Sequence, residues 1–109
     1  MTWPVEALLA AVRQIPAVSM EIDDAQRSAT VRVGARSVAC IDLLHGRVVV
    51  KAPADVIPTL QPVFPSSRPA ANGIAFDLAD DHARSEALAA IRRRVRVERV
   101  VAQLRDASP

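Results

Sequence analysis

Residues 30–51 read TVRVGARSVACIDLLHGRVVVK, and their pattern is the clearest indication of the fold. Apolar side chains alternate with polar ones on both sides of Gly34, which is typical of two strands joined by a tight turn. Residues 44–47 form a second turn signal, and the valine run 48–50 after it predicts a further strand. Turns this short connect neighbouring antiparallel strands. The stretch therefore predicts an antiparallel β-meander.

One further strand is expected before the meander and one after it. Residues 17–23 alternate, with Val18, Met20 and Ile22 on one face. Residues 73–78, which read GIAFDL, alternate in the same way later in the chain. We therefore expect an antiparallel sheet of about five strands.

Helical spacing predicts helices before and after the meander. Residues 4–14 place apolar side chains on one face and end before Pro16. A short middle helix opens at Pro53 and is interrupted by Pro58 and Pro62, and residues 65–69 are expected to form a loop. The apolar face of the first helix consists of Val5, Leu8, Leu9 and Val12.

A long last helix is expected from about residue 82 to residue 104, with Asp80 or Asp81 as its N-cap. The sequence thus predicts an α+β fold, in which an N-terminal helix, a short Pro-interrupted middle helix and a long C-terminal helix pack on the sheet. With 109 residues, the chain is long enough for a single domain, 1–109.

The last helix carries two apolar stripes that fall on nearly opposite sides of one cylinder. A break or a bend near residues 94–96 would bring both stripes to the same core, and we favour this interpretation because most apolar stripes serve the chain's own core. The alternative is a continuous helix that offers its later stripe to a partner. The early stripe is Leu88, Ile91 and Val95, and the late stripe is Val97, Val100, Val101 and Leu104.

Composition excludes several classes of protein. Half of the residues are hydrophobic and 24% are charged, so the chain can offset its ordering entropy and is not expected to be disordered. Charges and prolines interrupt every apolar run, which argues against a membrane span and a membrane partner. A single cysteine excludes an internal disulfide, and the first residues lack a basic, then apolar leader. We therefore expect a cytoplasmic protein.

Basic residues gather towards the end of the chain. The net charge is only +2, but residues 84–105 hold seven arginines and two glutamates. On a continuous helix, Arg92, Arg96 and Arg99 share one face, and such a row can follow a phosphate backbone. The alternative is a solvated helix face with no ligand.

Cysteine and histidine offer the most specific candidates for catalysis. In the strand over residues 37–43, the apolar positions are Val38, Ile41 and either Cys40 or Ala39. Cys40 and His45 are five residues apart around a turn, and a Cys–His pair can activate a thiolate. A free cysteine on an apolar strand is more often a buried core residue.

His82 stands beside two aspartates, as a general-base pair or a metal site would require, but the same residues also form an ordinary helix N-terminus. The sequence shows no metal-ligand spacing and no glycine-rich phosphate loop. It therefore predicts no metal site, no cofactor and no catalytic residue, and an enzyme with a site near Cys40, His45 or His82 is kept only as an alternative.

Several segments resemble the small MmcQ/YjbR-like proteins, across about residues 30–95. These are the strand–glycine–strand run 30–41, residues 47–56 (RVVVKAPADV), the Ser67-Arg68-Pro69 loop and the late strand 73–78. The sequence is similar as well to the small luciferase-domain family. Residues 70–73 stand where YjbR-like proteins usually carry a Lys/His/Trp cluster, and His45 stands alone where the second group has paired histidines. The resemblance implies a small α+β domain, and for the first family a DNA-binding role.

Three functions follow as hypotheses. The first is a non-catalytic interaction domain of unknown specific role that self-associates as a homodimer through the late stripe of its C-terminal helix. The second is a YjbR-like DNA-binding protein that uses the Arg92, Arg96 and Arg99 row. The third is the enzyme named above.

Overall fold

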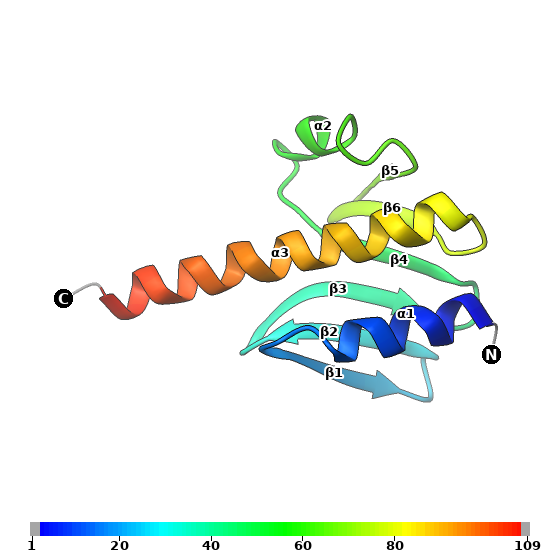
Figure 1. The fold of residues 1–109 in the computed structure, drawn as a ribbon, viewed down its shortest axis with the longest axis horizontal. Helices are drawn as coiled ribbons and strands as arrows, with labels where there is room; N and C mark the ends of the chain where they lie inside the picture. Colours follow the sequence, from blue (N-terminus) through cyan, green and yellow to red (C-terminus); the bar gives the residue numbers. More distant parts are fainter. Residues whose placement is uncertain (1–2, 108–109) are drawn as a thin grey trace.

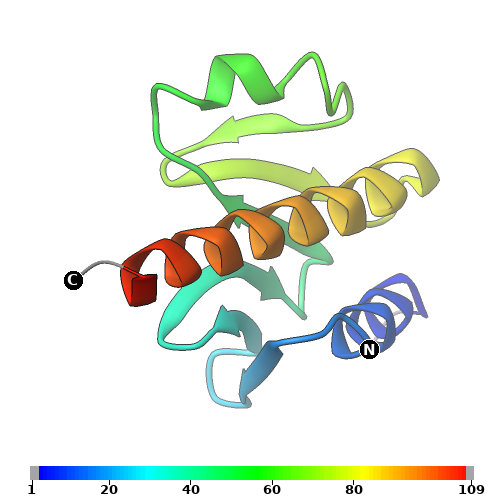
Figure 2. The ribbon, with the colours of Figure 1, turned by 60° about the vertical axis from the view of Figure 1, so that its left-hand side comes forward.

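A computed structural model describes residues 3–107 as one antiparallel sheet with α1 and α3 packed on the same face (Figures 1 and 2). This confirms the α+β class and the three expected helices. No helix among these residues is both long and apolar enough to cross a bilayer. The elements are α1 (Trp3–Arg13), β1 (Val18–Asp23), β2 (Ser28–Val33), β3 (Arg36–Asp42), β4 (Arg47–Lys51), α2 (Ile57–Leu60), β5 (Arg68–Ala70), β6 (Gly73–Asp77) and α3 (Asp81–Ala107).

The sheet has six strands in the order β1-β2-β3-β4-β6-β5, and every pair is antiparallel. Strands β2, β3 and β4 form the predicted meander, β1 is the strand expected over residues 17–23, and β6 is the late strand expected over residues 73–78. The additional strand is β5, which lies in and just after the segment expected to be a loop. It has only three residues and includes Pro69, which an edge strand tolerates but a sequence pattern does not reveal.

A bulge in β3 settles which of its side chains are buried. Val31 pairs with Ala39 and Arg32 pairs with Ser37, so Val38 is an extra residue on its strand. Val38 and Ala39 are both fully buried as a result, and Cys40 is exposed. The bulge therefore decides for Ala39 rather than Cys40 as the buried position.

Helix α3 is continuous, so the favoured break near residues 94–96 is wrong. Residues 81–107 contain no glycine or proline, which are the usual causes of a sharp kink. Asp80 caps the helix, since its side chain accepts hydrogen bonds from the backbone N–H groups of His82 and Ala83 at 2.8 and 3.3 Å. The C-terminal end of α3 extends past the strands (Figure 1).

The core lies between the sheet and the two long helices. On its sheet side, α3 buries three alanines, which allow a close approach, followed by Ile91 and Val95. Phe64 and Phe76 meet edge to face, with ring centroids 6.1 Å apart. The α1 residues expected to be buried all are, namely Val5, Leu8, Leu9 and Val12.

Candidate functional site

The late stripe of α3 is exposed on the part of the helix that leaves the sheet. Val97, Val100 and Leu104 are 44%, 53% and 65% exposed, and Val101 is half-buried. We call these four residues the apolar stripe. Large apolar side chains this exposed on neighbouring helical turns are a common mark of an interaction surface.

The predicted arginine row lies on a different side of the same helix. Arg92, Arg96 and Arg99 are all exposed, and they line a hollow of ≈ 260 Å³ between α3 and the end of α1. Within residues 3–107, no ion pair joins any of the three to an acidic side chain. The remaining walls of this hollow come from Gln14, Ile15, Pro16 and Val95.

A buried glutamate anchors α3 to the sheet where the helix leaves it. Glu98 is only 7% exposed, and its Oε1 accepts a hydrogen bond from Arg94 Nη2 at 2.6 Å. Its other oxygen lies 3.8 Å from Nε of Arg36 at the start of β3. The sequence analysis missed this contact. The i,i+4 spacing of Arg94 and Glu98 could have suggested the first half of it, but nothing pointed to Arg36.

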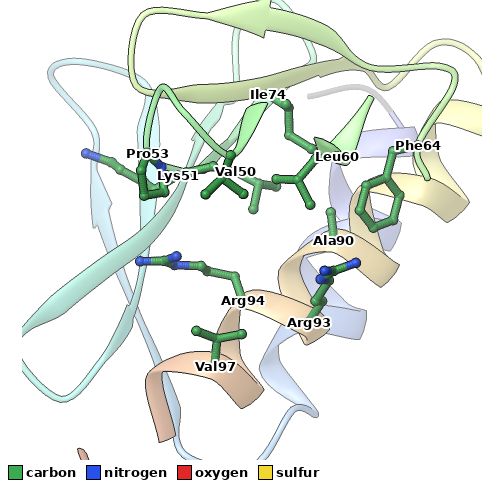
Figure 3. Close-up of a pocket in the computed structure, with 12 residues that line it drawn as sticks. Val50, Lys51, Pro53, Leu60, Phe64, Ile74, Ala90, Arg93, Arg94 and Val97 are labelled. Carbon is green, nitrogen blue, oxygen red and sulfur yellow. The ribbon is translucent and has the colours of Figure 1, made fainter. Parts of the chain in front are cut away.

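A pocket of ≈ 200 Å³ opens beside the apolar stripe, between α3, the α2 segment and the ends of β4 and β6 (Figure 3). Phe64, Leu60 and Ile74 lie on one side of it, and Ala90, Val97 and two arginines of α3 lie on the other (Figure 3). No motif in the sequence predicted this pocket, because its walls come from five separated segments.

Hydrogen bonds hold in place the loop that brings Phe64 to that pocket. Ser66 donates from its backbone N–H and its hydroxyl to the two carboxylate oxygens of Glu86 on α3, at 3.0 and 2.6 Å. The hydroxyl of Ser67 donates to the Phe64 carbonyl at 2.6 Å. The loop that carries Phe64 is therefore tied to α3 at one end of the pocket.

The residues considered for catalysis are engaged in other ways. His45 Nδ1 lies 2.8 Å from Asp42 Oδ2 in the turn after β3, and no hydrogen bond joins His45 to Cys40. The backbone N–H of His45 donates a hydrogen bond to the Asp42 carboxylate at 3.0 Å and holds the pKa of this carboxyl below its usual value. The hydrogen bond with the His45 imidazole ring lowers the same pKa further. This motif closes the turn, and it brings no acid or base to the cysteine.

His82 lies in the first turn of α3, exposed, where Asp80 acts as the helix cap. Among residues 3–107 no three His, Cys, Asp or Glu side chains gather in a way that could hold a metal ion. The structure thus brings together the α3 surfaces and the pocket, and it leaves the cysteine and the two histidines apart.

A scan against protein-family models and searches of curated proteins and of solved structures found no match for this chain. The resemblance to the YjbR-like and luciferase-domain families therefore stays a prediction.

Proposed function

We propose that the chain is an interaction domain that forms a homodimer through the apolar stripe of α3. The observation that carries this proposal is the exposure of Val97, Val100 and Leu104 on a continuous helix whose C-terminal end extends beyond its own sheet.

The spacing of the stripe favours a second copy of the same helix as the occupant. Positions 97, 100, 101 and 104 read the same in both directions, with steps of three, one and three residues. In an antiparallel pair, Val97 of each copy faces Leu104 of the other, and Val100 faces Val101. Every apolar side chain then meets an apolar side chain, which is the self-complementarity that a two-fold interface needs.

The size of the stripe indicates a weak dimer. Stable interfaces bury about 800 Å² on each partner, and four side chains cover much less than that. We therefore expect a dissociation constant of about 0.1–1 mM. Arginines surround the same half of α3, so the two copies repel each other and salt should strengthen the dimer by screening this repulsion.

Replacing Val100 with aspartate should abolish the dimer, because the new charge would lose its water in the middle of the interface. Sedimentation equilibrium of the parent over a concentration series up to about 1 mM should show the mass rise from 11.7 kDa towards twice that value. The variant should stay monomeric throughout. Ala102→Asp, which adds the same charge on an exposed position outside the stripe, should behave like the parent. A parent mass that stays monomeric over the series would overturn the proposal.

A second candidate function is the binding of nucleic acid by Arg92, Arg96 and Arg99. It is supported by their shared exposed side and by the absence of ion pairs to them among the described residues. Guanidinium groups in a row can contact successive phosphates. This binding should weaken with salt, which is the opposite of the dimer's response.

The triple variant Arg92→Gln, Arg96→Gln, Arg99→Gln should remove duplex DNA binding and lower the salt slope by about 2.7, which is 0.9 for each lost phosphate contact. Fluorescence anisotropy with labelled duplex at several salt concentrations measures both. A matched triple, Arg27→Gln, Arg47→Gln, Arg68→Gln, removes the same charge from exposed positions outside the arginine row. Equal losses in the two triples would show only a response to net charge and would reject the row as a site.

A further inference from the structure

We propose that the pocket between α2, β4 and α3 binds a small monocarboxylate with an apolar tail, because apolar side chains enclose it and two arginines of α3 lie along one wall. This site does not rest on self-association. It adjoins the dimer surface at Val97, which lines the pocket and begins the apolar stripe.

The lining of the pocket fits the tail of such a ligand. Val50, Leu60, Phe64, Ile74 and Ala90 supply aliphatic and aromatic surface, and none of them brings a polar side-chain atom. The volume is ≈ 200 Å³. A cavity of about 150 Å³ holds a benzene ring, so this pocket has room for about six to eight carbon atoms.

The arginines fit the carboxylate head. Arg94 lines the wall below Val50 and Pro53, and Arg93 lies beside Ala90 on the side of Phe64 (Figure 3). Nε of Arg94 is buried and has no hydrogen-bond partner within the described part of the chain. Guanidinium groups form charge-assisted hydrogen bonds with carboxylates, so the two arginines on this wall match a carboxylate head.

The charge around the pocket favours an anion over a neutral or cationic ligand. Glu98 is the acidic group beside Arg94, and it is already shared between Arg94 and Arg36. No acidic side chain among residues 3–107 forms an ion pair with Arg93. The wall therefore keeps a net positive charge for an incoming carboxylate.

Octanoate is the probe that tests this inference, with 1-octanol as the uncharged tail and acetate as the head alone. In ¹H–¹⁵N spectra of the full chain, octanoate should produce saturable shifts at the amides of Leu60, Phe64 and Ala90. Octanol should bind at least tenfold more weakly, and acetate should cause no saturable shift. Equal binding of octanol and octanoate would overturn the assignment of the head group, and saturable shifts elsewhere would overturn the site.

Two variants separate the pocket from non-specific binding. Ala90→Leu fills the pocket from its α3 wall and should weaken octanoate binding at least tenfold. Ala89→Leu, the same change at the exposed neighbouring position, should leave it unchanged. Arg93→Gln removes an exposed charge without disturbing the core, so it should weaken octanoate but not octanol even if Ala90→Leu fails to fold. Undiminished octanoate binding in Arg93→Gln would reject the role of this arginine.

The same titration on the Val100→Asp variant keeps the two proposals apart. Octanoate should bind this monomeric variant as it binds the parent, because Val100 does not line the pocket. A parent that never dimerises but binds octanoate would overturn the proposed function alone. Loss of octanoate binding in Val100→Asp would overturn the claim that the site does not rest on self-association.

Discussion

Gly73→Ala is expected to destabilise the protein by about 3–5 kcal/mol, a large part of the total stability of a domain of this size. Gly73 is the first residue of β6 and lies opposite Lys51 of β4. A Cβ atom there would lie 1.9 Å from the Val50 carbonyl oxygen and 2.8 Å from its carbon. Backbone atoms cannot move aside as a side chain can, so β4 and β6 would have to separate at this point.

Urea unfolding followed by circular dichroism measures this loss, and Gly34→Ala is the comparison. Gly34 has a positive φ of 60° but nothing within 4 Å of an added Cβ. Its substitution should therefore cost only the backbone strain, about 1 kcal/mol. If the two variants were equally stable, the close approach of β4 and β6 would not be what requires a glycine at position 73.

The same glycine shows where prediction from sequence reaches its limit. The alternation in residues 73–78 predicts the strand, but the requirement for glycine comes from a strand more than twenty residues earlier. The meander, the helices and the buried α1 face could all be predicted because each depends on a local pattern. The short edge strand β5 and the bulge at Val38 depend on pairing partners, which the local pattern does not contain.

The candidate site divides in the same way. The apolar stripe and the arginine row lie on one helix, and their spacing alone was enough to find them. The expected break in that helix was wrong because the core side of α3 is completed by Ala83, Ala87 and Ala90, small residues that did not stand out as an apolar stripe. The pocket and the Arg94–Glu98–Arg36 contact join separated segments, and only the structure brings these together.

Helix α3 thus carries three surfaces, which are a buried face, the apolar stripe and the arginine row. The buried face packs on the sheet and thereby holds the apolar stripe and the arginine row in position. Self-association through the apolar stripe and DNA binding by the arginine row should respond to salt in opposite directions, so one sample can distinguish the two activities. Self-association should increase as salt screens the arginines from one another. DNA binding should decrease as salt competes for the phosphates.

Glu98→Ala should lower the free energy of unfolding by about 2–3 kcal/mol, because it leaves Arg94 partly buried without its carboxylate partner. Arg94 keeps only 27% of its side chain exposed and cannot regain full hydration without moving. The loss should also loosen the C-terminal end of α3, which extends beyond the sheet. Hydrogen exchange of the amides from residue 96 to residue 104 should therefore rise more than exchange in the first turns of the helix.

An exposed ion pair supplies the control for this prediction. Glu21 and Arg32 pair at 3.0 Å with side chains that are 70% and 37% exposed, so Glu21→Ala should cost no more than about 1 kcal/mol. The double variant Glu98→Leu, Arg94→Leu removes both charges and should recover much of the stability lost in Glu98→Ala, since no buried charge is left behind. If the double variant were less stable than Glu98→Ala, the cost would come from lost packing of the arginine stem rather than from its unpaired charge.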